Sequence, residues 1–153
     1  MTLAAVCTEL SGEGAVEVQT LDAAPLGPTA VRIAVRAASV NFPDVLMTRG
    51  LYQLRLEPPF VPGSECAGVI TEVGADVSGL AAGDRVLTLC GSGAFATEVL
   101  ATPPAQVHRM PDAMSFDEAA SSNLTYGTGY HGLIRRGGLQ AGQRGPWPGM
   151  FSQ

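Results

Sequence analysis

Residues 39–69 read SVNFPDVLMTRGLYQLRLEPPFVPGSECAGV, and the interpretation of the whole chain starts from this stretch. Pro43 suits the first position of a helix, where its missing N–H costs nothing. Asp44 would lie in the first turn, where a carboxylate favours the positive end of the helix dipole. Gly50 is a common stop after a helix. The stretch therefore predicts a short helix that opens at Asn41.

Polar side chains gather in this stretch, and we expect them to converge on one concave surface. Pro58-Pro59 forces an extended path after the helix, and Pro62-Gly63 then turns the chain into a new apolar run. A structural interpretation of each side chain stays open, since an aspartate in a first helical turn is usually a capping residue. Glu65 could be a charge at the rim or half of an ion pair, and Tyr52 a packing aromatic. The converging residues would be Asn41, Asp44, Tyr52, Ser64 and Glu65.

Composition favours a single domain with a real core. The chain has 153 residues, of which 46% are hydrophobic and 15% are charged. That balance is too apolar for a disordered chain. The net charge is −5 without a basic cluster, so we expect no nucleic-acid partner and weak repulsion from anionic membranes.

Three widely spaced cysteines, Cys7, Cys66 and Cys90, form no CxxC pair. This argues against a four-thiolate zinc site and against a secreted disulfide framework. The N-terminus lacks the basic start of a signal peptide, and no uncharged apolar run reaches membrane-spanning length. The expectation is a cytoplasmic protein with reduced thiols.

Short strands separated by glycine and proline turns predict a mainly β fold with short helices (α+β). Gly68 within one strand indicates a bulge or a close backbone approach. Strands every 8–12 residues are typical of a compact, partly closed β-barrel. The expected strands cover residues 3–8 and 15–20 as a pair joined by a turn at 11–14, then 31–36, 67–73, 83–89, 95–100 and 106–110.

Helices follow the strands. Ser115 and Glu118 form a capping box that predicts a helix to about Asn123. A second helix is expected over about 125–136 although it contains Gly127, Gly129 and Gly132, each of which costs up to about 1 kcal/mol of helix propensity. That cost suggests that the barrel or a ligand packs close to the helix.

Four segments in fixed order resemble the start of the catalytic domain of the medium-chain dehydrogenase/reductases, and are most similar to the zinc-independent quinone oxidoreductase branch. The segments are VNFPD at 40–44, RGLY at 49–52, PFVPGSE at 59–65 and AGVI at 67–70. The resemblance runs from about residue 3 to about residue 143. It implies a GroES-like catalytic domain over 1–124, and over 125–143 the start of the helix that leads to a cofactor domain.

The resemblance also implies a chemistry: direct hydride transfer from NADPH to a quinone or an α,β-unsaturated carbonyl (enone). In the zinc-dependent alcohol dehydrogenases of the superfamily, cysteine, histidine and cysteine ligands stand where this chain has Asn41, Ser64 and Leu124, so a site without metal is expected. The implied site residues are catalytic Asn41, Asp44 and Tyr52, cofactor-binding Asn41 and Thr128, and substrate-pocket Tyr52, Ser64 and Glu65.

The last ten residues, RGPWPGMFSQ at 144–153, depart from the resemblance. Two prolines within three residues do not fit the central strand that should precede a Rossmann glycine turn. We expect a shifted reading frame or a truncated gene, no Rossmann domain, doubtful NADPH binding by the chain alone, and an exposed interdomain face prone to homo-oligomer formation or aggregation. Whether the chain is an enzyme stays open, with a stand-alone GroES-like binding module and an inactive gene remnant as alternatives.

Overall fold

The computed structural model describes residues 1–11, 15–103 and 106–143. The expected tail at 144–153 lies outside the described residues, as does most of the turn expected at 11–14. The elements are β1 (Thr2–Cys7), β2 (Val16–Leu21), β3 (Val31–Ala38), α1 (Phe42–Thr48), β4 (Glu65–Val73), β5 (Arg85–Leu89), β6 (Glu98–Ala101), β7 (Val107–Arg109), α2 (Phe116–Ala120), α3 (Ser122–Tyr130) and the π-helix η1 (His131–Arg136).

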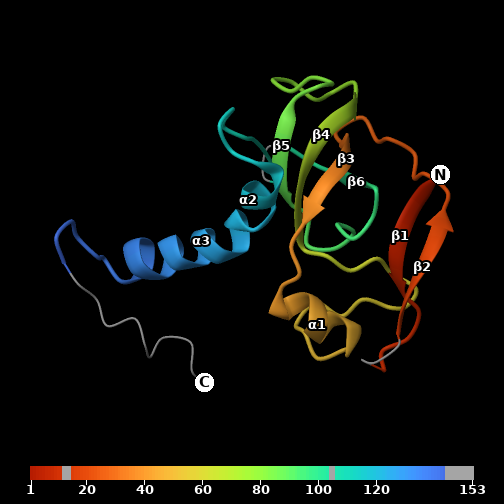
Figure 1. Cartoon of the computed structure of the whole chain (residues 1–153), viewed down its shortest axis with the longest axis horizontal. Helices are drawn as coiled ribbons and strands as arrows, with labels where there is room; N and C mark the ends of the chain where they lie inside the picture. Colours follow the sequence, from red (N-terminus) through yellow and green to blue (C-terminus); the bar gives the residue numbers. More distant parts are fainter. Residues whose placement is uncertain (12–14, 104–105, 144–153) are drawn as a thin grey trace.

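Two antiparallel sheets wrap around the core without closing. β1 and β2 pair with each other, and the larger sheet has the order β6-β3-β4-β5-β7. Backbone bonds join β1 to the segments that lead into β6 and β4: the Ala5 N–H donates to Phe95 O (2.8 Å) and the Cys7 N–H to Phe60 O (2.7 Å). Figure 1 shows α1 at one end of the larger sheet and α2 beside it. The expected partly closed β-barrel with short helices is confirmed.

One strand prediction was wrong in its extent. Residues 95–100 were expected to form one strand, but β6 covers Glu98–Ala101. Residues 95–97 run along β1 instead, where Ala96 bridges to Ala4 and the Thr97 N–H donates to Leu3 O (2.8 Å). Alternation of side chains continues through this change of partner, so the sequence pattern alone does not reveal it.

Aliphatic side chains from the inner face of the larger sheet form the main core. Most of its buried members lie on β3, β4, β5 and β6, so neighbouring strands share one apolar layer. They include Val31, Ile33, Cys66, Ile70, Val86, Val99 and Ala101. This layer fixes β4, which begins at the residues of the candidate site.

Gly68 confirms the expected close approach of backbone. A Cβ atom at this position would lie 2.1 Å from the carbonyl oxygen of Ala34 on β3. The register between β3 and β4 also shifts between Val35 and Ala37, beside the pairing of Val35 with Gly68. The strands therefore bend together at a point where only hydrogen fits.

The first helix forms where the sequence predicts it. Asn41 is its N-cap in extended backbone, and Gly50 follows the last turn with φ of 66°. Pro43 occupies the second helical position rather than the first, because the helix begins at Phe42. A missing N–H is equally harmless there, since neither position donates within the helix.

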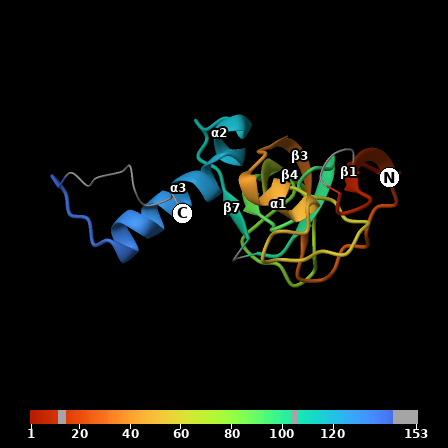
Figure 2. The same cartoon turned by 90° about the horizontal axis from the view of Figure 1, so that it is seen from below.

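The predicted boundary between the two later helices was wrong. The capping box of Ser115 and Glu118 is present, but α2 ends at Ala120 and α3 begins at Ser122. We call α3 and η1 together the helical arm, which projects away from the barrel in both views (Figures 1 and 2). Within the described chain, no heavy atom apart from the neighbouring residues and the helix's own backbone lies within 4 Å of a Cβ built at Gly127 or Gly132. The expectation that the barrel packs against these glycines is therefore also wrong, because the arm leaves the barrel surface.

None of the helices in the described ranges is both long and apolar enough to cross a membrane.

Candidate active site

A hollow of about 440 Å³ lies between the start of α1 and the first two turns of α3. Its wall combines the N-terminal turn of α1 with one face of α3. The lining residues are Asn41, Phe42, Pro43, Leu124, Thr125, Thr128 and Gly129. We call this hollow the α1–α3 cavity.

Glu65 connects the two walls of the α1–α3 cavity. It is the first residue of β4, and only 1% of it is exposed. Its Oε1 accepts hydrogen bonds from the Ser39 hydroxyl (2.8 Å) and from Nδ2 of Asn41 (3.2 Å). Its Oε2 accepts the backbone N–H of Leu124 (3.0 Å). One carboxylate thus holds the barrel and the root of the helical arm together.

Asp44 and Ser64 form a second buried pair next to Glu65. The Ser64 hydroxyl donates to Oδ1 of Asp44 (2.5 Å), and the Asn41 backbone N–H donates to Oδ2 (2.8 Å). Asp44 is 2% exposed. The carboxylate therefore acts as the cap of α1 and also braces the segment that leads into β4. These contacts fit the structural interpretation of Asp44, and a catalytic role stays a prediction.

Thr128 and Tyr52 have different positions relative to this network. Thr128 lies one turn after Leu124 and lines the α1–α3 cavity together with Asn41. Tyr52 is half-buried in the loop after α1, does not line that cavity, and its hydroxyl makes no hydrogen bond within the described chain. The structure thus brings together Asn41, Asp44, Ser64, Glu65 and Thr128, and leaves Tyr52 outside.

Ser39 is a member of the network that the sequence interpretation missed. Its hydroxyl donates to Glu65 and accepts Nδ2 of Asn41 (2.9 Å). The available signal was its position two residues before Asn41 at the end of β3. A serine at a strand end is common, so its position alone does not predict a role in the site. Its role is recognised only because the structure places Glu65 within hydrogen-bonding distance.

The side chains at the cavity do not fit a catalytic zinc ion. Asn41 uses its amide nitrogen on Ser39 and Glu65, Ser64 donates to Asp44, and Leu124 has no donor atom for a metal. In the described ranges, no group of three or more His, Cys, Asp or Glu side chains is placed to hold a metal ion. Thiolates and imidazoles are the usual ligands of catalytic zinc, and this wall offers neither.

Two thiols lie next to Ser64 and Glu65: Cys66 follows Glu65 on β4, and Cys90 is bonded to the backbone of Ser64. Cys66 is fully buried and hydrogen bonds to Cys90, and this bond, followed by burial, raises the pKa of Cys66. The same bond lowers the pKa of Cys90. The backbone N–H of Cys90 also donates to Ser64 O (2.9 Å), just before β4. The Cys90 thiol therefore loses its proton more readily than the Cys66 thiol.

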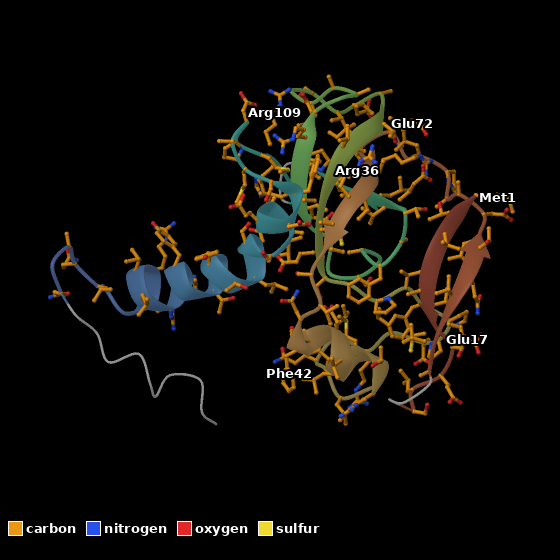
Figure 3. The ribbon with its side chains drawn as sticks, in the orientation of Figure 1. Met1, Glu17, Arg36, Phe42, Glu72 and Arg109 are labelled. Atoms are coloured by element: carbon orange, nitrogen blue, oxygen red, sulfur yellow. The ribbon has the colours of Figure 1, made fainter. Side chains whose placement is uncertain are left out.

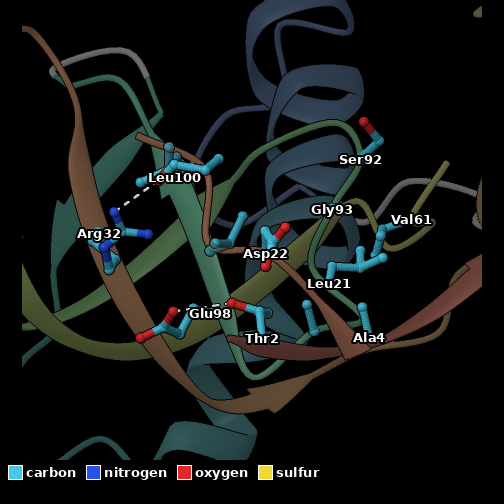
Figure 4. Close-up of a pocket in the computed structure, with 13 residues that line it drawn as sticks. Thr2, Ala4, Leu21, Asp22, Arg32, Val61, Ser92, Gly93, Glu98 and Leu100 are labelled. Carbon is cyan, nitrogen blue, oxygen red and sulfur yellow. Dashed lines mark hydrogen bonds between the residues drawn. The ribbon is translucent and has the colours of Figure 1, made fainter. Parts of the chain in front are cut away.

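A second hollow of about 270 Å³ lies on another part of the barrel (Figure 4). Arg32 lines it but is already engaged, with Nε on Glu72 Oε1 (2.7 Å) and Nη2 on Ala24 O (2.8 Å). Glu98 accepts the Thr2 hydroxyl (3.0 Å). The Arg32 bonds tie β3 to β4 and to the segment after β2, and the Thr2 bond ties β1 to β6, so we interpret this hollow as structural.

Glycines of α3 and η1 repeat the spacing of a dinucleotide fingerprint without its geometry. Gly127, Gly129 and Gly132 match G-x-G-x-x-G. The fingerprint needs a turn between a strand and a helix, where the pyrophosphate reaches the helix N-terminus. Here the three residues lie inside helical segments, so they form no such phosphate cradle.

Comparison with known sequences gives one family and many relatives. The family described as "Alcohol dehydrogenase GroES-like domain" matches residues 27–112. The quinone oxidoreductase-like protein 2 homolog of Nematostella vectensis is 41% identical over 140 residues, which are 92% of this chain and 38% of the relative. The synaptic vesicle membrane protein VAT-1 homolog of Rattus norvegicus is 44% identical over 140 residues, which are 90% of this chain and 34% of that protein. The chain thus spans little more than a third of the length of these relatives.

Solved structures give the same picture. A probable oxidoreductase from Mycobacterium abscessus is 38% identical with a TM-score of 0.87, over 94% of this chain and 46% of that one. The quinone oxidoreductase of Escherichia coli, solved with NADPH, is 26% identical with a TM-score of 0.80, over 89% of this chain and 41% of that one.

Proposed function

Because the chain belongs to the alcohol dehydrogenase GroES-like domain family, within the medium-chain dehydrogenase/reductases, we propose that it supplies one wall of a hydride-transfer site. The complete enzyme would reduce a quinone or an enone with NADPH and without zinc. The activity is proposed for a protein of the relatives' length, since this chain spans 38% of its Nematostella relative.

The observation that carries the proposal is the α1–α3 cavity, where Asn41 and Thr128 face one space. The resemblance implies that Thr128 lies near the nicotinamide ring and that Asn41 hydrogen bonds either its carboxamide or the substrate carbonyl. NADPH, when bound, would supply the hydride. The chain's own contribution is to orient the ring between α1 and α3, with the buried carboxylates of Asp44 and Glu65 holding the first wall rigid.

The wall's donor set supports a mechanism without zinc, because a leucine and two hydrogen-bonded polar side chains stand at the positions of metal ligands in zinc-dependent relatives. The test is a metal analysis of a chimera in which residues 1–143 replace the matching part of the Mycobacterium abscessus oxidoreductase. Zinc well below one equivalent, with activity that survives a chelator, is the expected result. Stoichiometric zinc whose removal abolishes turnover would contradict this part of the proposal.

Large apolar side chains are exposed at both ends of α1 and on the helical arm. Phe42 is 73% exposed at the start of α1, where it points outward in Figure 3, and Leu51 is 70% exposed after that helix. On the arm, Tyr126 and Tyr130 are 76% and 60% exposed. An apolar surface of this kind marks an interface or an aggregation site. We propose that this face docks another domain or a second copy, and light scattering with a hydrophobic dye tests whether the chain alone is a clean monomer.

The proposal is tested by transplanting residues 1–143 into the matching part of the Mycobacterium abscessus oxidoreductase, whose structure is similar over 94% of this chain. We expect this chimera to oxidise NADPH with 1,4-benzoquinone, whereas the 153-residue chain alone should show negligible turnover. Asn41→Ala and Thr128→Val should each lower kcat/KM about tenfold, as expected for one lost hydrogen bond in the transition state. Thr102→Val is the matched control for Thr128→Val, because Thr102 is exposed and does not line the α1–α3 cavity.

A folded chimera that binds NADPH but reduces neither a quinone nor an enone would contradict the proposal. The alternative of a stand-alone binding module would then come first. The buried polar network argues against that alternative, because a pure scaffold has no need of two buried carboxylates beside a cavity. A cytoplasmic location stays a prediction, in keeping with the three free cysteines.

A further inference from the structure

Cys66 and Cys90 come from neighbouring strands and face the same layer of the core. Cys66 on β4 lies directly opposite Thr88 on β5, and Cys90 stands two residues after Thr88, so the three side chains share one face of the sheet. Cys90 stays beside the start of β4, because its backbone N–H donates to Ser64 O (2.9 Å). Both cysteines pack in the main core, and a hydrogen bond joins their thiols. The fold therefore brings into contact two sulfur atoms that are far apart in sequence.

The two thiols differ in what can reach them. Cys66 is fully buried, whereas Cys90 is half-buried directly after β5, where the chain turns at Gly91 with φ of 78°. The Cys90 thiol is held loosely, since it donates over long distances to the carbonyl oxygens of Ser64 (3.5 Å) and Gly63 (3.7 Å). The bond from Cys66 lowers the pKa of Cys90, and the thiolate is the nucleophilic form of a cysteine. A small oxidant from solvent would therefore react with Cys90 first.

We infer that Cys66 and Cys90 are a peroxide-sensitive thiol pair, in which a peroxide oxidises Cys90 and Cys66 then closes an intrachain disulfide beside the candidate site. The inference does not rest on the proposed hydride transfer. Closing the disulfide takes the Cys90 sulfur away from the Ser64 carbonyl. Because the Ser64 hydroxyl donates to Asp44 (2.5 Å) and Glu65 is the next residue, the change occurs next to both buried carboxylates of the first wall.

The reaction balances with the peroxide as its oxidant. The Cys90 thiolate forms an S–O bond while the O–O bond of the peroxide breaks, and the departing oxygen takes up a proton and leaves as water or an alcohol. Cys90 is thereby oxidised to a sulfenic acid, and the peroxide receives the electron pair. Cys66 then attacks the Cys90 sulfur, so that the S–S bond forms, the S–O bond breaks, and hydroxide leaves as water with the proton of Cys66. One peroxide thus converts the two thiols into one disulfide.

The first test uses the complete 153-residue chain in its folded state. Reduced protein is treated with hydrogen peroxide, the remaining thiols are alkylated with iodoacetamide in denaturant, and the chain is cut with trypsin without reduction. Trypsin cuts after arginine and places Cys7, Cys66 and Cys90 on the separate peptides 1–32, 56–85 and 86–109. The last two contain no methionine, so a change in their mass reports the cysteines alone.

We expect peptide 56–85 to be joined to peptide 86–109, two hydrogen masses lighter than their sum, and to be released by dithiothreitol. Cys7 is fully buried on β1, where its thiol donates to Glu9 O (3.2 Å), so it should be recovered alkylated. Full alkylation of both Cys66 and Cys90 would overturn the inference. Oxidation of Cys7 as fast as Cys90 would do the same, as would a link between two copies, seen as a dimer on a gel without reductant.

Single substitutions separate the roles of the two thiols. Cys66→Ala should stop the reaction at the Cys90 sulfenic acid, which dimedone traps. Cys90→Ala should slow thiol oxidation at least about tenfold, because the remaining thiols are fully buried. Cys7→Ala is the matched control and should form the disulfide as fast as wild type. Loss of the Cys66 thiol at the wild-type rate in Cys90→Ala would show that Cys90 is not the thiol attacked first.

A second readout needs no variant and reports the wall itself. In the ¹⁵N spectrum of the wild-type chain, peroxide should shift the amide resonances of Ser64 and Glu65, and dithiothreitol should restore them. The amide of Leu133 in η1 should stay in place. Resonances of Ser64 and Glu65 that do not move when the disulfide forms would overturn its effect on the candidate site.

Discussion

The barrel and the helical arm meet at the α1–α3 cavity, but they are held in different ways. Barrel residues such as Ile33, Ile70 and Val86 are at most 1% exposed, whereas neither α3 nor η1 has a buried residue. Long-range strand pairing fixes the barrel's wall of the cavity. The arm's wall depends on the short helix α2 and on the bond from Glu65 to the Leu124 N–H.

This difference shows where the cavity is rigid. Asn41, Asp44 and Glu65 belong to a wall with many shared contacts, so their geometry should survive changes elsewhere. Thr128 lies on a wall with few contacts, so its position depends on what covers the arm. The site is thus built from a fixed half and an adjustable half, as expected where a second domain completes a site.

The largest expected effect comes from removing core volume in the barrel. Ile33→Ala should lower the free energy of unfolding by about 2–5 kcal/mol, because Ile33 is fully buried and leaves a cavity. Ile134→Ala in the arm should change it by less than about 0.5 kcal/mol, because that side chain is 39% exposed. Urea unfolding followed by circular dichroism measures both. Equal losses would show that the arm is packed in solution and would remove the contrast.

A smaller effect is expected from adding one methyl group to a glycine of each region. Gly68→Ala should destabilise the barrel by about 2 kcal/mol or more, because the new Cβ would lie 2.1 Å from Ala34 O. Gly127→Ala should raise helix content, with a gain of up to about 1 kcal/mol in helix propensity, since its Cβ would meet no atom within 4 Å. Thermal unfolding and the helical circular dichroism signal distinguish the two. A loss of stability in Gly127→Ala would reveal a partner packed on the arm.

The smallest effect concerns acid. In the barrel, Arg109 on β7 donates to Asp84, the residue before β5, and this bond holds the pKa of Asp84 below its usual range. A lowered pKa gives stability that is present above the unfolded value of about 3.9 and is lost as pH falls through the folded value. Asp84→Asn should therefore flatten the fall of Tm below about pH 4. Asp76→Asn, at an exposed aspartate, is the control and should leave the slope unchanged.

Acid should also weaken the α2 capping box at the root of the helical arm. Bonds from the backbone N–H and hydroxyl of Ser115 lower the pKa of Glu118. Its contribution to the α2 cap is likewise lost as pH falls through the lowered value. Glu118→Gln should reduce the acid sensitivity of the α2 amide resonances without altering those of β3. An unchanged pH profile in this variant would show that the capping box does not hold the arm's root.

Local features of the fold could be predicted because they depend on neighbouring residues. The α1 helix, the stop at Gly50 and the capping box at Ser115 follow from backbone preferences within a few residues. Gly68 was also predicted, because a glycine within a strand has few other uses. The change of partner within residues 95–100 could not be predicted, since both partner strands impose the same alternation.

The sequence by itself determined the strands, the short helix α1 and the family to which the chain belongs, because these depend on periodicity and on residues close in sequence. Only the tertiary structure decided that Glu65 reaches Leu124, which lies 59 residues later, that Ser39 joins the network, and that Tyr52 stays outside it. The tertiary structure likewise decided that Nδ2 of Asn41 donates to Ser39 and Glu65. A hydrogen bond between distant residues depends on distances and on the match of donor and acceptor, and packing alone sets both.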